Sequence, residues 1–166
     1  MEIAAGVRAR KLRAADVVAQ ALDRIERTDP RLCAFVEVWG EEALRRAGEV
    51  DRRLDRRAAD PSLALAGVPI AVKGRHGLRT AGPLLAAGAV AVGATSVPGP
   101  GTPWQTWGLG SRGRTVNPWR ADRTPGGSSA GAAAARRHLR DRIPAGLLRG
   151  PLQHRPGPDH PRFRVR

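Results

Sequence analysis

The chain has few of the residues on which secreted, membrane-spanning and metal-binding proteins depend. Its single cysteine, Cys33, excludes an intramolecular disulfide and fits a reducing cytoplasm. No run of 18 apolar residues occurs, and no basic start leads into an apolar leader, so neither membrane spanning nor secretion is indicated. The histidines lack metal-ligand spacing. We therefore expect a cytoplasmic protein without a membrane partner, a metal or a cofactor.

Aromatic residues and lysines are also scarce. Aromatics make up 4% of the chain and hydrophobic residues 41%, many of them alanines, so we expect a shallow core. The chain has two lysines, Lys11 and Lys73, against 27 arginines, and its formal net charge is +14. A lysine in such a chain is therefore a residue whose surroundings are informative.

The last part of the chain differs in composition from the rest. Residues 136–166 hold nine arginines and two aspartates, a net charge of 9 − 2 = +7. High charge, few apolar residues and scattered prolines favour disorder. We expect a partial domain over residues 1–135 and an Arg/Pro-rich disordered tail over 136–166. Because a one-base shift at the codons of Arg136 to His138 can encode Val-Ala-Thr, we also hypothesise that this tail is out of frame.

The rest of the chain alternates between helical and strand patterns. Apolar spacing predicts helices at Asp16 to Arg27 and Glu41 to Arg57, strands at Cys33 to Val38, Val68 to Val72 and Ala89 to Val92, and a helical turn at Leu84 to Ala87. The first helix is expected to stop at Asp29-Pro30. The Gly, Pro and Trp content of Val97 to Arg114 indicates a long loop. Alternating helices and strands favour an α/β fold.

Two segments carry the chemistry. Residues 123–131, Arg-Thr-Pro-Gly-Gly-Ser-Ser-Ala-Gly, combine a glycine pair with two serines whose hydroxyls can donate and accept protons. Residues 67–73, Gly-Val-Pro-Ile-Ala-Val-Lys, are an apolar run that ends on Lys73. A lysine at the end of a buried strand can lose its proton and act as a base.

These segments resemble those of the amidase signature family, serine hydrolases with a Ser, Ser, Lys arrangement. Residues 87–98 and Val116-Asn117-Pro118-Trp119 are also similar to segments of that family. The resemblance runs from about residue 12 to residue 135. It implies the N-terminal part of the amidase signature fold, a mixed β-sheet flanked by helices, here with an incomplete sheet. It also implies an amidase that hydrolyses a carbon–nitrogen bond of a small-molecule amide through a serine acyl-enzyme.

The same resemblance assigns the site residues. It implies that Lys73 is the catalytic lysine, kept uncharged by burial, and that Ser128 is the bridging serine on a cis peptide bond. Ser129 is expected to be a supporting hydroxyl, and Gly126 and Gly127 to shape the loop. The family's nucleophile would lie near Leu152, but no Ser, Thr or Cys follows Ser129. The sequence therefore provides no nucleophile there, and we expect this chain to be inactive.

Two other functions remain open from the sequence. The same motifs occur in the amidase subunit of a tRNA-dependent glutamine amidotransferase, of which this chain would be a fragment. A pI of about 11.8 is also typical of a basic nucleic-acid-binding protein. Because the arginines are spread along the chain, we expect nucleic acid to bind only nonspecifically, through the tail. Trp104, Trp107 and Trp119 either line a substrate pocket or anchor loops on the sheet.

Overall fold

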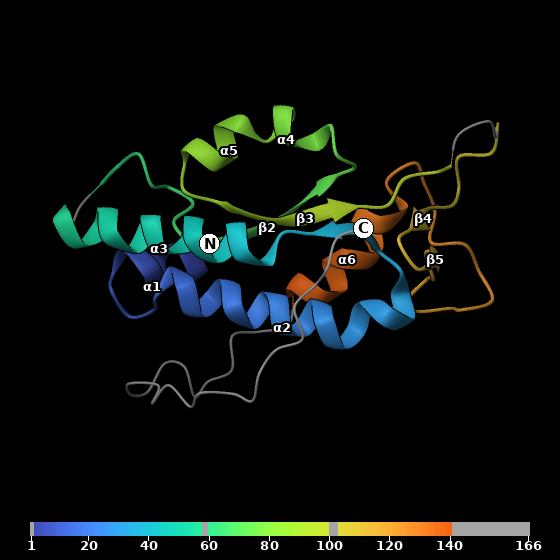
Figure 1. Ribbon diagram of the computed structural model, residues 1–166, viewed down its shortest axis with the longest axis horizontal. Coiled ribbons are helices and arrows are strands. Elements are labelled where there is room, and N and C mark those ends of the chain that lie inside the picture. The colour runs from blue at the N-terminus through green and yellow to red at the C-terminus, as the bar shows by residue number, and fades with distance from the viewer. Residues whose placement is uncertain (1, 58–59, 100–102, 141–166) are drawn as a thin grey trace.

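The computed structural model describes residues 2–57, 60–99 and 103–140. In these residues a small sheet lies between a pair of short helices on one face and longer helices on the other (Figure 1). This three-layer arrangement confirms the α/β fold class expected from the alternating patterns.

The elements follow one another in a simple order. The helices are α1 (Glu2–Arg8), α2 (Ala14–Leu32), α3 (Gly40–Arg56), α4 (Gly77–Thr80), α5 (Gly82–Ala86) and α6 (Ala130–Arg140), and the strands are β1 (Phe35–Val38), β2 (Pro69–Lys73), β3 (Val90–Thr95), β4 (Leu109–Gly110) and β5 (Gly113–Arg114). The hairpin of β4 and β5 lies inside the segment expected to be an irregular loop, and α1 precedes the first predicted helix. Short strands rich in glycine, like β4 and β5, carry little periodic signal.

The main sheet has the strand order β1-β3-β2. Strand β3 is central: it pairs antiparallel with β1 and parallel with β2. The parallel register places Lys73 opposite Thr95, at the carboxyl ends of both strands. Strand β2 is at an edge of the described sheet, so its end is open on one side.

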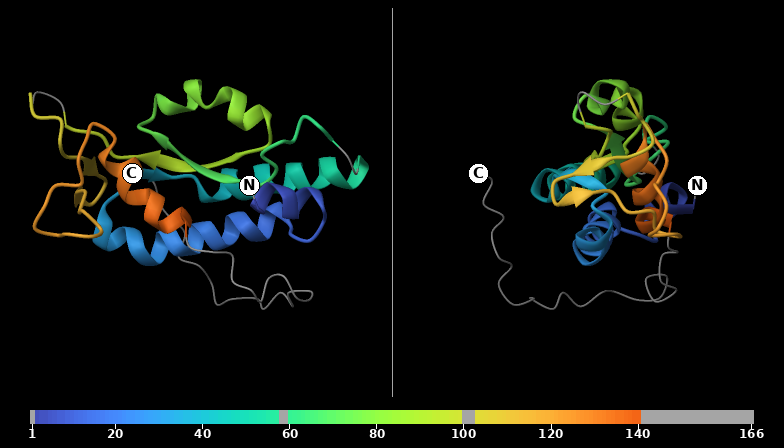
Figure 2. Two further views of the ribbon diagram at one scale, coloured as in Figure 1. Left: turned by 180° about the vertical axis from the view of Figure 1, so that it is seen from behind. Right: turned by 90° about the vertical axis from the view of Figure 1, so that its right-hand side faces the viewer.

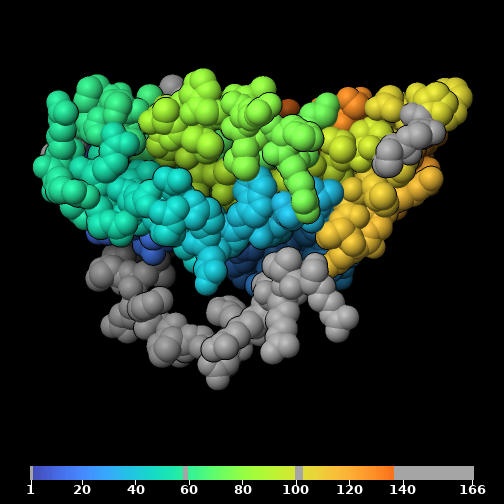
Figure 3. Space-filling view, turned by 45° about the horizontal axis from the view of Figure 1, so that its top comes forward, coloured from blue at the N-terminus to red at the C-terminus, as the bar shows by residue number. Residues whose placement is uncertain are grey.

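Helices cover both faces of this sheet (Figure 2). The larger apolar cluster joins α2, α3 and α6 to the sheet, and its biggest fully buried side chains are Phe35, Ile25, Leu54 and Leu63. The smaller cluster includes Val72, Ala81 and Ala94, under α4 and α5, which form the green surface of the space-filling view (Figure 3). Many core positions are alanines, as the composition indicates.

Helix α2 begins and ends on buried carboxylates. Asp51 of α3 is 4% exposed and accepts hydrogen bonds from the backbone N–H groups of Ala14 at 2.8 Å and Ala15 at 3.1 Å. At the other end the helix does not stop at Asp29-Pro30 as expected, but continues to Leu32. The stop was wrong because the Asp29 carboxylate accepts from the N–H of Ala34 and the Asp29 carbonyl from that of Cys33, which together satisfy the last turn around Pro30.

The tail expected over residues 136–166 is described only in its first residues. Helix α6 continues through Arg140, past the expected boundary at residue 135, and the remaining tail residues lie outside the described ones. In the described part of the chain, no helix is both long and apolar enough to cross a bilayer.

Candidate active site

Lys73 is the last residue of β2, at the carboxyl end of the sheet. Apolar residues Ile70 and Val72 pack under α4 and α5, and strand alternation directs Lys73 to the opposite face, where α6 lies. There the Lys73 Nζ donates a hydrogen bond to the Ser128 Oγ at 2.9 Å. Two residues 55 positions apart in sequence are thus brought into direct contact.

The loop that carries Ser128 depends on its two glycines. Gly126 has a φ of +83°, in the left-handed region that favours glycine. Gly127 lies so close to the preceding loop that an added Cβ would be 2.7 Å from the Gln105 carbonyl carbon and 3.0 Å from the Thr106 Cα. The peptide bond between Gly127 and Ser128 is cis, as the resemblance implies. Helix α6 starts two residues after Ser128.

The structure corrects one expectation about Lys73. Burial was expected to keep this side chain uncharged, but it is exposed. The physical reason is its position: it ends an edge strand, and among the described residues the Ser128 loop reaches it from only one side. Ser128 is half-buried and Ser129 is exposed.

The chain matches a family of known proteins over most of its length. A sequence model of the family described as Amidase matches residues 16–82 and 79–135. The chain belongs to the amidase signature family. The match confirms the family that the motifs indicated, and it ends in α6.

Individual relatives of this amidase-family chain are longer than it is. It is 36% identical over 154 residues to a subunit of the glutamyl-tRNA(Gln) amidotransferase of Thermosynechococcus vestitus, covering 76% of this chain and 30% of that protein. A solved peptide amidase from Stenotrophomonas maltophilia superposes with a TM-score of 0.63 at 27% identity, over 82% of this chain and 33% of that one. A fatty acid amide hydrolase gives a TM-score of 0.73 at 24% identity, over 83% and 28%, which shows a shared fold. The chain spans about 30% of the length of its curated relative.

Ser129 contacts the rest of the amidase site through its backbone. Its carbonyl oxygen accepts a hydrogen bond from the Ala133 N–H at 2.9 Å, which forms the first turn of α6. The supporting role expected for its hydroxyl stays a prediction. Gly126 and Gly127 lie beside Ser128 in the same loop, and all of these residues precede α6 directly.

Three buried hydroxyl residues near the pair were missed from the sequence. Thr95 and Ser96 are both 0% exposed at the end of β3, and Thr115 is 5% exposed after β5. The Ser96 Oγ lies 2.5 Å from the Thr115 Oγ1, which donates to the Cys33 carbonyl at 2.8 Å. A usable signal was present: two polar residues follow directly on the apolar run that forms β3.

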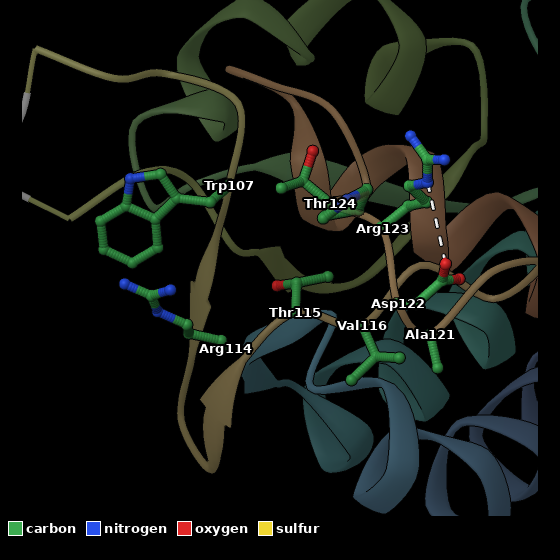
Figure 4. A pocket seen from close by; sticks show the side chains of 9 residues that line it. Trp107, Arg114, Thr115, Val116, Ala121, Asp122, Arg123 and Thr124 are labelled. Carbon is green, nitrogen blue, oxygen red and sulfur yellow. Dashed lines mark ion pairs between the residues drawn. The ribbon is translucent and has the colours of Figure 1, made fainter.

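The tryptophans of this amidase-family chain divide between the two alternatives. Trp104 and Trp119 are 75% and 67% exposed, whereas Trp107 is half-buried and lines a cavity of about 270 Å³ beside the Ser128 loop (Figure 4). The Arg114 guanidinium lies 5.0 Å from the centre of the Trp107 ring, a cation–π contact. On the loop from Ala121 to Pro125, which completes the cavity, a hydrogen bond from Arg120 lowers the pKa of the Asp122 carboxyl.

Proposed function

We propose that Lys73 and Ser128 are the proton-transfer pair of a site that hydrolyses the carbon–nitrogen bond of a small-molecule amide. The single observation that carries this proposal is the 2.9 Å hydrogen bond between the Lys73 Nζ and the Ser128 Oγ. In this role Ser128 takes the proton of an attacking hydroxyl and passes its own proton to Lys73. Gly126, Gly127 and Ser129 support the loop. Positioned proton transfer of this kind accelerates a reaction by about 10²- to 10⁴-fold.

The attacking hydroxyl is the part that this chain does not supply. No Ser, Thr or Cys follows Ser129, and Leu152 stands near the position that the family's nucleophile would occupy. We therefore propose that the chain of 166 residues forms no acyl-enzyme by itself, in the cytoplasm or in the test tube. The exposure of Lys73 supports the same proposal, because desolvation is what disfavours the ammonium form of a lysine base.

A fusion protein tests the roles of the pair. Residues 1–135 would be joined to the part of the Thermosynechococcus vestitus relative that follows its matched segment, and ammonia release from glutamine and from a peptide amide would be measured. We expect the fusion to hydrolyse an amide and Lys73→Met or Ser128→Ala to lose at least about 10²-fold of kcat. Lys11→Met and Ser62→Ala are the matched controls, because both residues are exposed and lie outside the site. A Lys73→Met fusion with full activity would overturn the assignment.

The inactivity of the unfused chain needs its own measurement. A fluorophosphonate probe labels serines that are activated as nucleophiles. We expect no labelling of the 166-residue chain and labelling of the fusion at a serine contributed by the relative. Labelling of the unfused chain at Ser128 or Ser129 would show that it carries an active nucleophile after all.

A second function is favoured by the identity of the curated relative. At 36% the similarity to an amidotransferase subunit exceeds the 27% to the peptide amidase. This chain would then correspond to part of the subunit that releases ammonia from glutamine. The fusion distinguishes the two: hydrolysis of glutamine with little activity on the peptide amide favours the amidotransferase subunit, and the reverse favours a general amidase.

A further inference from the structure

Thr95 holds the backbone on both sides of Lys73. The Thr95 hydroxyl donates to the Val72 carbonyl at 3.0 Å, and the Thr95 carbonyl accepts from the Gly74 N–H at 3.0 Å. Thr95 is fully buried and lies opposite Lys73 in the parallel register. The residues immediately before and after Lys73 are therefore both fixed to one residue of the central strand.

Ser96, the next residue, holds the start of α6. Its carbonyl accepts from the Gly131 N–H at 3.1 Å, and its own N–H donates to the Ala34 carbonyl at 2.8 Å. Gly131 is three residues after Ser128 and packs directly on Ser96, since an added Cβ there would come within 3.0 Å of the Ser96 N and Oγ. The loop with Ser128 is thus tied to β3 by its first helical turn.

Thr115 fixes the side chain of Ser96. Because the Thr115 Oγ1 donates its proton to the Cys33 carbonyl at 2.8 Å, the Ser96 Oγ is the donor in the 2.5 Å contact between the two hydroxyls. Gly108 allows this approach: an added Cβ there would lie 2.6 Å from the Ser96 Oγ and 2.9 Å from the Thr115 Oγ1. The hydroxyl of Ser96 is therefore held in one orientation by groups from two other segments.

We propose that Thr95 and Ser96 are positioning residues that set the distance between Lys73 and Ser128. One dipeptide at the end of β3 connects the strand that carries Lys73 to the helix start that carries Ser128. Neither residue contacts the proton path itself, so each acts through the backbone it holds. This inference rests on the proposed function of the pair, but its test measures the geometry of the pair and needs no hydrolysis.

The test uses the fact that the chain has only two lysines. The folded 166-residue chain would be treated briefly with an acylating reagent, and the extent of reaction at Lys73 relative to the exposed Lys11 would be measured by peptide mass spectrometry. The amine of Lys73 must leave Ser128 before it reacts. We therefore expect Ser128→Ala to raise the Lys73 to Lys11 ratio by about fivefold, the effect of losing one hydrogen bond.

The positioning variants are compared with that reference. Thr95→Val and Ser96→Ala are expected to raise the ratio at least about twofold, and to raise it no further when combined with Ser128→Ala. The absence of an additional effect in the double variants identifies action through Ser128, because independent effects add. Thr95→Ser keeps the hydroxyl and should retain the original ratio. Thr80→Val is the matched control, since its hydroxyl also donates to a backbone carbonyl, that of Gly77, but at an exposed site.

The outcomes separate this inference from the proposed function. If Ser128→Ala leaves the ratio unchanged, the pair itself is not formed in solution and both proposals fail. If Ser128→Ala raises the ratio but Thr95→Val and Ser96→Ala do not, the pair stands and the positioning role is overturned. The positioning role also fails if Thr95→Ser behaves like Thr95→Val, or if the effects add in the double variants. Far-UV circular dichroism identifies a variant that unfolds, and the remaining variant then decides.

Discussion

Replacing Gly131 by alanine is expected to destabilise the protein, although the same replacement stabilises most helices. Gly131 lies in the first turn of α6 and packs against β3 and the residue that precedes β1. An alanine Cβ there would come within 3.0 Å of the Ser96 N and Oγ and the Ala34 carbonyl oxygen. Two of these three atoms belong to the backbone and cannot rotate away. The helix start must therefore move.

The magnitude follows from three effects. Overpacking of this kind costs up to about 3 kcal/mol, and the movement weakens the hydrogen bond from Gly131 to Ser96, worth about 1 kcal/mol. Alanine gains at most about 1 kcal/mol over glycine in helix propensity. The free energy of unfolding should fall by about 3 kcal/mol, which for a domain of this size lowers the melting temperature by about 10 °C.

Urea and thermal denaturation followed by far-UV circular dichroism measure this change. Gly48→Ala is the matched control, because Gly48 is also in a helix, α3, and an added Cβ there would meet only the flexible Arg52 side chain at 3.4 Å. The control should be stabilised by about 0.5 to 1 kcal/mol. If Gly131→Ala is stabilised to the same degree as Gly48→Ala, the close contact between α6 and β3 is wrong.

Three further changes have expected outcomes. Asp51→Ala removes the buried acceptor of two backbone N–H groups and should lower the free energy of unfolding by about 2 to 3 kcal/mol, whereas Asp55→Ala, on the exposed side of the same helix, should lower it by less than about 1 kcal/mol in the same urea titration. Burial raises the pKa of the Cys33 thiol, so stability should be complete below the ordinary thiol range and fall as the pH rises through it; iodoacetamide should alkylate Cys33 slowly until urea unfolds the chain, and rapid alkylation of the folded chain would contradict this. The hydrogen bond from Arg120 lowers the pKa of Asp122, so their contact should persist above the ordinary carboxyl range and break as the pH falls through the lowered value, which a carboxyl ¹³C titration compared with Arg120→Gln would detect.

The sequence predicts the architecture and the pairing partners well, because both depend on local patterns. Apolar spacing identifies α2, α3 and the three strands of the main sheet, and the family motifs select Lys73 and Ser128, which the structure brings to 2.9 Å. The end of α2 was misjudged because Pro30 alone suggests a stop. Side-chain acceptance by Asp29 from residues beyond the helix depends on the tertiary path of the chain and has no periodic signature.

The hydroxyl residues around Ser96 were missed for a similar reason. Thr95, Ser96 and Thr115 lie in three different local patterns, and their importance arises only when α6 and the β4–β5 hairpin meet the end of β3. The glycines show the same dependence. Gly131 looks like a weak position in an alanine-rich helix, but its missing Cβ is what permits the contact with Ser96.

A lysine base needs both a position and a desolvated environment, and in this chain the two have separate origins. Its position is set by residues 67–131: the strand end, the Gly-Gly-Ser loop and the contacts of β3 with both. Its environment is set by whatever covers the open edge of β2, because Lys73 is exposed among the described residues although its hydrogen bond to Ser128 is formed. Geometry alone therefore does not make Lys73 a base. Any segment that restores hydrolysis must cover this edge as well as supply a nucleophile, and a fusion that adds a serine but leaves Lys73 accessible to acylation should remain inactive.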